Sequence, residues 1–256
     1  RIGGKGLFVK ELETAQADGS ADLAVHSIKD VPMNLPDGLT MAATGEREDA
    51  RDAFVSNNFD NLESLPHGSI VGTSSLRRQS QIQARFPHLK IESLRGNVQT
   101  RLRKLDEGQY AAIILAAAGL IRLELGNRIR GFIAPTDSIP AVGQGALGIE
   151  INANRTDLIE ILAPLNHIDT QLCVEAERAF SRALAGSCTV PLGAYALKEG
   201  STINITGFVA SVDGKQMLRE TTIGSISNAD AVGRALADKL IERGANKILA
   251  ALDHIK

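Results

Sequence analysis

Basic residues gather in one stretch of the sequence, residues 72–105. Eight of the chain's 28 Lys and Arg residues lie there with only one of its 30 acidic residues, so the stretch is basic and the remainder is acidic. It opens with GTSSLRR, where hydroxyls and two arginines stand at the expected passage from a strand into a helix. The first N–H groups of a helix lack intrahelical partners and carry partial positive charge. The pattern therefore predicts an anion site.

A carboxylate suits this stretch best, because a guanidinium group binds both carboxylate oxygens, whereas a Lys ammonium acts as a point charge. Four arginines recur at strand-to-helix turns, where α/β sheets bind their ligands. We expect these four to contact the ligand: Arg77, Arg78, Arg95 and Arg101. The other basic residues fit a solvated face: Arg85, Arg103 and Lys104. Nucleic acid is the less favoured anion, since aromatic residues are only 4% of the chain and no groove-reading motif is present.

Lys29 and Asp30 follow an apolar run and precede Pro32, in the sequence HSIKDVP. Adjacent opposite charges are most often a surface ion pair of little consequence. Here they stand at the carboxyl end of an expected strand, which favours a functional role. A carboxylate that faces arginines stays ionised, and it can accept a hydrogen bond from an N–H group that becomes positively charged.

The chain contains two cysteines, Cys173 and Cys188. So few do not form a disulfide framework, and they fit a reducing cytosol. Cys173 lies in an apolar helical run and is expected to be structural. Cys188 lies in a loop, GSCTVP, where a thiol is a plausible nucleophile or attachment point. No spacing typical of metal ligands is present.

The elements that must position these residues form two patterns. A buried strand is expected at residues 21–28. Further strands are expected at residues 69–73, 89–94 and 110–119. They alternate with two helices, one capped by Ser74 or Ser75 and the other by Asn97. This alternation is typical of a parallel sheet with helices on both faces. The charged run 45–51 is expected to cross between domains. After His167 a long helix, three strands and two helices predict a separate α+β domain. No apolar run is long enough to span a bilayer.

Seven motifs occur in the order found in the porphobilinogen deaminase family, also called hydroxymethylbilane synthases. They are GGKGLFVKELE, DLAVHSIKDVP, REDARDAFVS, GTSSLRRQ, LRGNVQTRL, AVGQGALGIE and GSCTVPLGAYA. The chain resembles this family over its whole length. The resemblance implies two doubly wound α/β domains, similar to type II periplasmic binding proteins, with a cleft between them. It also implies a C-terminal α+β domain with a three-stranded antiparallel sheet.

The same resemblance implies domain limits. Residues 1–45 and 146–163 would form domain 1, residues 51–139 domain 2, and residues 168–256 the C-terminal domain that carries the cofactor. Family members begin with a further strand and helix, so the N-terminal part of domain 1 is expected to be missing from this sequence.

The implied function is that of a transferase in tetrapyrrole and haem biosynthesis. It joins four porphobilinogen molecules head to tail into hydroxymethylbilane and releases ammonia, on a covalently bound dipyrromethane cofactor. Because substrate and growing product carry carboxylates, the arginines would be their counterions. The family resemblance further implies a cytoplasmic monomer without metal, nucleic acid or membrane partners.

The resemblance assigns roles residue by residue. Cys188 matches the residue that holds dipyrromethane through a thioether, and Asp30 matches the catalytic carboxylate that accepts hydrogen bonds from pyrrole N–H groups. Cofactor binding would involve Lys29, Asp30, Thr73, Ser74, Ser75, Arg77, Arg78, Arg95, Arg101 and Gln144. Substrate binding would involve Arg95, Arg101, Arg122, Lys5 and Phe8, the last two in a mobile Gly-rich loop over the active site.

Two other classes of function remain open at this point. One is a non-catalytic two-domain binding protein that grips a small di-acid, against which the third domain and its GSCTVP loop argue. The other is a nucleic-acid-binding module. A dipyrromethane adduct, which adds mass and reacts with Ehrlich's aldehyde reagent, distinguishes the enzyme from both.

Overall fold

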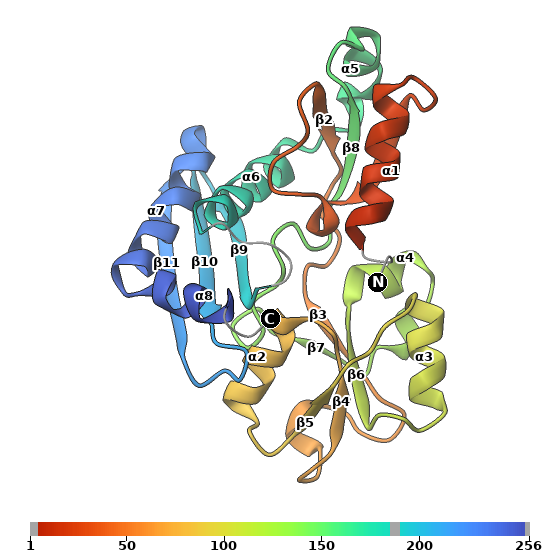
Figure 1. Cartoon of the computed structure of the whole chain (residues 1–256), viewed down its shortest axis with the longest axis vertical. Helices are drawn as coiled ribbons and strands as arrows, with labels where there is room; N and C mark the ends of the chain where they lie inside the picture. The colour runs from red at the N-terminus through yellow and green to blue at the C-terminus, as the bar shows by residue number, and fades with distance from the viewer. Residues whose placement is uncertain (1–4, 185–189, 254–256) are drawn as a thin grey trace.

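The computed structural model describes residues 5–184 and 190–253, which form three β-sheets with helices packed around them (Figure 1). Short 3-10 turns connect several elements: η1 (Ile28–Asp30), η2 (Leu62–Ser64), η3 (Gly126–Arg128), η4 (Ala163–Leu165) and η5 (Ile226–Asn228). Within the described residues, no helix combines the length and apolar character that crossing a membrane requires. The α/β class expected from the sequence is confirmed.

The first sheet has the order β1 (Leu23–Ser27), β8 (Leu147–Asn152), β2 (Leu39–Thr44), and its strands are antiparallel. Helix α1 (Lys5–Ala17) covers one face, where Gln16 bonds to Glu150. The next residue of the strand, Ile151, points to the other face and packs against Leu162 of α5 (Thr156–Leu162). Successive residues of a strand point to opposite faces, so both faces carry a helix.

Strand β1 corrects one expectation. Residues 21–28 were expected to form a buried strand, but only alternate side chains are buried, and Leu23 and Val25 are 37% and 55% exposed. The prediction was wrong on burial because the face that carries Leu23 and Val25 stays uncovered at β1, and a short apolar run does not reveal whether both of its faces are covered.

The second sheet has five strands in the order β5 (Lys90–Glu92), β4 (Ile70–Gly72), β6 (Ala112–Ala116), β3 (Asp52–Val55), β7 (Gly131–Ile133). β4 runs parallel to β5 and β6, as the alternating pattern predicted, whereas β3 is antiparallel to both β6 and β7. The sheet is therefore mixed.

Helices cover both faces of this sheet. Ile82 of α2 (Leu76–Arg85) packs on the side of Phe54 and Ile114, and α3 (Val98–Asp106) and α4 (Ala117–Arg122) pack on the side of Val55 and Ile113. Asn97 caps α3 as predicted, since its side chain accepts a hydrogen bond from the Thr100 N–H at 2.8 Å. Residues 117–119, expected to continue a strand, instead begin α4.

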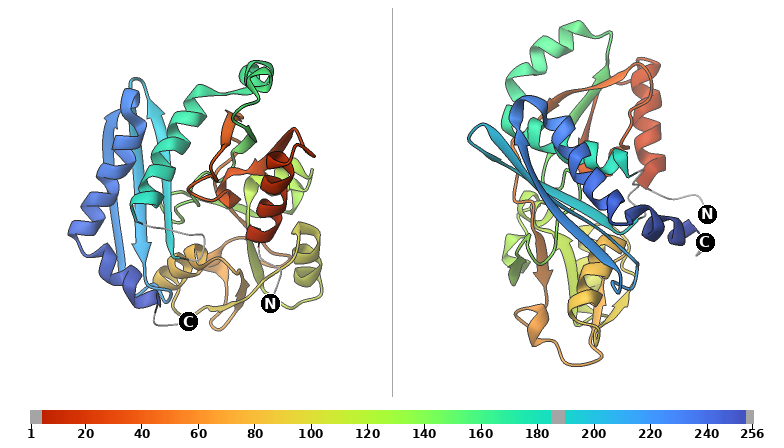
Figure 2. Two further views of the ribbon diagram at one scale, coloured as in Figure 1. Left: turned by 45° about the horizontal axis from the view of Figure 1, so that its top comes forward. Right: turned by 90° about the vertical axis from the view of Figure 1, so that its left-hand side faces the viewer.

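The third sheet is antiparallel, in the order β11 (Met217–Ser225), β10 (Thr202–Ala210), β9 (Leu192–Glu199), as expected. Helices α6 (Ile168–Ala183) and α7 (Ala229–Glu242) lie on one face of it, and α8 (Ala245–Asp253) follows (Figure 2). The sheet and helices share one apolar core that includes Phe180, Ile205 and Leu236.

The chain passes twice between the first two sheets. Residues 45–51 connect β2 to β3, so the charged run is a crossing as predicted, and the return lies between β7 and β8. The domain limits given above remain a prediction.

Candidate active site

Asp30 ends η1, the short turn that directly follows β1. Ile28, at the start of this turn, is only 2% exposed, and its N–H donates to the Ala146 carbonyl at 3.0 Å. The Val31 N–H closes the turn on the Ile28 carbonyl at 3.0 Å. The buried Ile28 side chain and the hydrogen bond that closes the turn together hold the half-buried Lys29 and Asp30 at the end of the strand.

Arg101 of α3 interacts electrostatically with Asp30, although the two residues come from different sheets. Burial lowers the pKa of Arg101, and the Asp30 carboxylate opposes this shift. The guanidinium Nε donates to the Gly96 carbonyl at 2.8 Å, which orients the side chain. Arg101 in turn contributes to lowering the pKa of Arg78. Asp30, Arg101 and Arg78 therefore form one charge cluster.

Asp52, at the start of β3, is the centre of a buried polar network. It accepts hydrogen bonds from Arg77 Nη1 at 2.8 Å, Arg77 Nη2 at 3.0 Å and Arg78 Nε at 3.0 Å. Ser138 Oγ and Gln144 Nε2 also donate to it, at 2.7 and 2.9 Å. Burial disfavours the charged form, but the two arginines outweigh it and hold the pKa of Asp52 far below its usual range.

Two buried arginines share this single carboxylate, so the network keeps excess positive charge. Burial lowers the pKa of Arg78; the charge of Asp52 opposes this shift, while Arg77 and Arg101 add to it. An additional anion near Arg78 would offset this charge. Gln144, which is fully buried, contributes by accepting from Arg77 Nη2 at 3.4 Å.

The hydroxyl residues before α2 make local bonds. The Thr73 N–H donates to the Glu92 carbonyl at 3.0 Å, and Ser74 Oγ donates to the Leu94 carbonyl at 2.9 Å. These bonds join the ends of β4 and β5. Ser75 is the N-cap of α2, as its Oγ accepts from the Arg78 N–H at 3.3 Å. The arginines therefore begin the helix as expected.

The remaining predicted residues lie in different surroundings. Arg95 and Arg122 are exposed, and Arg122 Nη2 donates to the Gly145 carbonyl of the return crossing at 2.8 Å. Lys5 and Phe8 lie in the first turns of α1, so the expectation that they form a loop is wrong. Apolar residues have helical spacing from Leu7 to Ala15, and the helix extends from them back to Lys5. Cys188 lies outside the described residues.

Cys173 is buried and free. Burial and then the Glu177 charge raise the pKa of its thiol to about 11, so little thiolate forms at neutral pH. The described residues contain no group of His, Cys, Asp and Glu side chains that could hold a metal ion.

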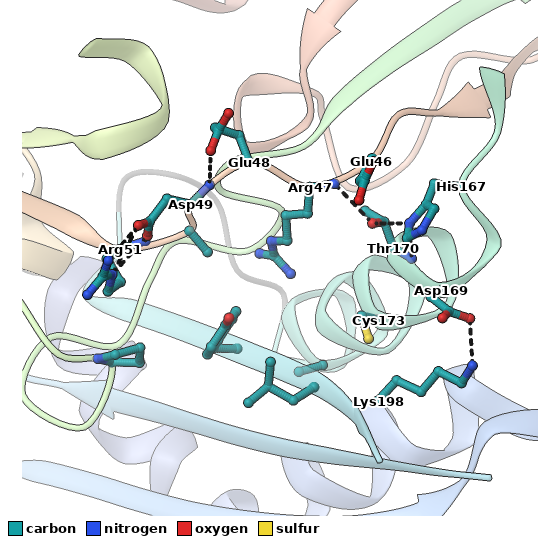
Figure 3. A pocket seen from close by; sticks show the side chains of 15 residues that line it. Glu46, Arg47, Glu48, Asp49, Arg51, His167, Asp169, Thr170, Cys173 and Lys198 are labelled. Carbon is teal, nitrogen blue, oxygen red and sulfur yellow. Dashed lines mark hydrogen bonds and ion pairs between the residues drawn. The ribbon is translucent and has the colours of Figure 1, made fainter. Parts of the chain in front are cut away.

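Figure 3 shows a cavity of about 480 Å³ on another part of the molecule, between the crossing 45–51, the start of α6 and β9. None of the predicted site residues lines it. Its basic groups already have acidic partners: Arg51 pairs with Asp49 at 2.7 Å, Lys198 with Asp169 at 2.8 Å, and Arg47 with Glu177 at 2.6 Å. We therefore place the candidate site at Asp30 and Arg101 and not in this cavity.

Sequence reasoning did not single out Asp52 or Ser138. The only signal for Asp52 was its position directly after the basic and acidic residues of the crossing, in REDARDAFVS.

Residues 1–160 match the family model described as "Porphobilinogen deaminase, dipyromethane cofactor binding domain", and residues 171–242 match "Porphobilinogen deaminase, C-terminal domain". The chain belongs to the porphobilinogen deaminase family. A porphobilinogen deaminase of Methylobacillus flagellatus is 72% identical over 254 residues, which cover 99% of this chain and 82% of the relative. One of Chromobacterium violaceum is 61% identical over 252 residues, covering 98% of this chain and 82% of the relative.

Among solved structures, a nutrient binding protein from Burkholderia cenocepacia bound to methionine is similar with a TM-score of 0.42 and 14% sequence identity. The similar region covers 59% of this chain and 73% of that protein.

Proposed function

We propose that this member of the porphobilinogen deaminase family performs its reaction at the charge cluster of Asp30, Arg101 and Arg78. The enzyme is a transferase of tetrapyrrole biosynthesis that joins four porphobilinogen molecules head to tail into hydroxymethylbilane, with release of ammonia. The observation that carries the placement is that Asp30, which follows a strand of the first sheet, lies near enough to Arg101 of α3 for its charge to oppose the burial that lowers the pKa of that guanidinium group.

The residues near Arg78 fit the carboxylates of the dipyrromethane cofactor. Two arginines with one buried counterion leave positive charge for an additional anion. When bound, dipyrromethane supplies the terminal pyrrole to which the first substrate molecule is joined. The residues proposed to hold it are Lys29, Asp30, Thr73, Ser74, Ser75, Arg77, Arg78, Arg95, Arg101 and Gln144, with a thioether to Cys188.

In this proposal Asp30 acts electrostatically. Loss of ammonia and carbon–carbon bond formation place positive charge on pyrrole nitrogens. A carboxylate held in advance within hydrogen-bond distance of those N–H groups stabilises that charge without reorganising. Ile28 and the closed η1 turn provide this fixed position.

The arginines have a separate task, which is to bind and orient the substrate carboxylates. We assign it to Arg95, Arg101 and Arg122, with Lys5 and Phe8 as further contacts. Exposed guanidinium groups such as those of Arg95 and Arg122 can reach an incoming di-acid. We further propose that the enzyme works as a monomer in the cytosol.

The function is tested by incubating the purified protein with porphobilinogen and following ammonia release and product mass. The expected result is catalytic formation of hydroxymethylbilane by protein that carries the dipyrromethane adduct. A two-domain binding protein would instead bind the di-acid and return it unchanged. Cofactor-loaded, folded protein that left porphobilinogen unaltered would contradict the proposal.

A further inference from the structure

One face of helix α6 contacts the chain on both sides of Asp30. Val174, Arg178 and Arg182 are spaced four residues apart, so they lie on the same side of the helix. Val174 touches the residues before Asp30, and the two arginines touch the residues after it. α6 belongs to the third sheet's core, whereas Asp30 follows a strand of the first sheet.

The contact before Asp30 is apolar. Val174, Ile28 and Ala146 form a small cluster, and their exposed fractions are only 4%, 2% and 1%. Ile28 is the first residue of the turn that ends in Asp30. This packing fixes the start of the turn against α6.

The contact after Asp30 is polar and involves three consecutive carbonyl groups. Arg178 Nη2 donates to the Pro32 carbonyl at 2.6 Å and to the Met33 carbonyl at 3.2 Å, and Nη1 approaches the Val31 carbonyl at 3.4 Å. Arg182 Nη1 reaches the same Met33 carbonyl at 3.5 Å. The side chain of Met33 also packs against the core of the third sheet.

Arg178 is partly buried, and it donates hydrogen bonds to backbone carbonyl groups. Within the described residues it forms no ion pair, whereas its neighbour Arg182 pairs with Asp230 at 3.1 Å. Burial and then the Arg182 charge lower the pKa of Arg178 to about 10. A charged donor on neutral carbonyls makes stronger bonds than a neutral donor would. The planar guanidinium group of Arg178 can donate to several carbonyl groups at once, whereas the ammonium group of a lysine cannot do so with the same geometry.

We propose that Arg178 is a positioning residue for Asp30. By holding the carbonyls of residues 31–33, while Val174 holds Ile28, it fixes the turn from which the Asp30 carboxylate projects. This inference rests on the proposed function of Asp30. It also means that a shift of α6 relative to the first sheet moves Asp30, so the third sheet influences the reacting centre.

The test compares Arg178→Lys and Arg178→Met with wild type, using cofactor-loaded enzyme quantified by intact mass. A misplacement of about 1 Å at a reacting group costs on the order of 10²-fold in rate. We expect kcat per loaded molecule to fall about 10-fold for Lys and about 10²-fold for Met, with little change in KM. Arg234→Lys, on the exposed pair with Asp230 in α7, is the matched control and is expected to match wild type.

A double-mutant cycle separates positioning from structure. In the Asp30→Asn background, Arg178→Lys is expected to have almost no further effect on kcat, because the group that it positions has lost its charge. If the fold-loss of kcat in the double variant equals the product of the losses in the two single variants, Arg178 does not act through Asp30 and the inference is wrong. If Arg178→Met does not fold, the Lys cycle still decides. Should Asp30→Asn alone turn over like wild type, the proposed function of Asp30 fails, and this inference with it.

Discussion

At the scale of single residues, the basic stretch divides into two kinds of arginine. Arg77 and Arg78 are buried and share Asp52, whereas Arg95 is exposed and Arg101 interacts with Asp30. Sequence spacing grouped all four together because each follows a strand. Their different surroundings lead us to expect different results on mutation: loss of fold and cofactor for the first pair, and loss of substrate affinity or turnover for the second.

The first prediction concerns the cofactor attachment. Peptide mapping of holo-protein is expected to locate the dipyrromethane mass on Cys188 and none on Cys173, whose buried thiol has a raised pKa. Cys188→Ser is expected to be inactive, because a hydroxyl is a far poorer nucleophile than a thiol at neutral pH. A free Cys188 thiol in active enzyme would remove this assignment.

The second prediction concerns Asp30. Asp30→Asn keeps the shape but removes the charge, so we expect turnover to fall about 10²–10³-fold, as for the loss of one preorganised electrostatic contact. Asp30→Glu keeps the charge and is expected to retain more activity than Asn. Single-turnover consumption of porphobilinogen by cofactor-loaded variants measures this. KM is expected to change less than kcat, because the arginines bind the carboxylates independently.

The third prediction concerns acid stability. The pKa of Asp52 is lower in the folded protein than in the unfolded chain, where it is about 3.9. The ionised Asp52 therefore contributes its full share to the free energy of unfolding above the pKa of the unfolded chain. This contribution decreases as the pH falls from there towards the pKa of the folded protein. Asp52→Asn is expected to cost about 3–5 kcal/mol at pH 7, since it leaves two buried arginines without a counterion.

The difference in unfolding free energy between wild type and Asp52→Asn is expected to shrink below about pH 4, where the Asp52 carboxyl of the unfolded chain begins to bind a proton while that of the folded protein stays ionised. Denaturant unfolding at several pH values measures it. Asp37→Asn, at an exposed position before β2, serves as the control. A difference that stayed constant down to pH 2 would show that the charge of Asp52 contributes nothing to stability.

At the scale of elements, the position of α6 depends on how closely it crosses α7. Gly233 of α7 lies against the Ala176 carbonyl of α6, and a Cβ built on it would be 2.9 Å from the Phe180 N. A methyl group there would have to push backbone apart. Because α6 also carries Val174 and Arg178, which contact the segment around Asp30, we expect this crossing to affect both stability and the site.

The fourth prediction follows from that contact. Gly233→Ala is expected to destabilise the protein by about 1–3 kcal/mol through overpacking and to lower turnover. The matched control is Gly119→Ala in α4, where nothing lies within 4 Å and the backbone is helical. Alanine there is expected to stabilise by up to about 1 kcal/mol through helix propensity. Chemical denaturation measures the change in the free energy of unfolding for both variants, which is expected to be negative for Gly233→Ala and positive for Gly119→Ala. Equal changes in the two variants would contradict the packing argument.

At the scale of the whole molecule, Glu177 of α6 joins the two crossings to the third sheet. It accepts from Arg47 of the first crossing at 2.6 Å, from the Gly143 N–H of the return crossing at 2.7 Å and from the Ala196 N–H of β9 at 2.9 Å. Arg47 Nε also donates to the Gln144 carbonyl at 2.8 Å, and the Gln144 side chain continues to Asp52. The two crossings and the third sheet are thereby joined through one buried carboxylate.

The fifth prediction tests this connection. Glu177→Gln leaves Arg47 buried without a counterion, so we expect a loss of about 3–5 kcal/mol in the free energy of unfolding. Glu242→Gln, at the exposed end of α7, is the control and is expected to stay within about 0.5 kcal/mol of wild type. Urea unfolding followed by far-ultraviolet circular dichroism compares them. Equal stability of both variants would show that the connection does not hold the sheets together.

The sequence by itself determined what depends on neighbours along the chain. The helices and strands of residues 70–116, the Asn97 and Ser75 caps, the crossing at 45–51 and the three strands after residue 190 were predictable, because periodicity and capping act over a few residues. The antiparallel order of those three strands followed from the family resemblance. The family motifs also pointed to Asp30 and Cys188 as chemical groups. Only the tertiary structure decided that β1 is half exposed.

It also decided the partners of the charges. Asp52 meets residues that lie 25, 26, 86 and 92 positions away, and Arg178 meets carbonyls about 145 positions away. Local patterns carry no information about such contacts, because they arise only when separate elements pack and bury polar groups that must then find partners.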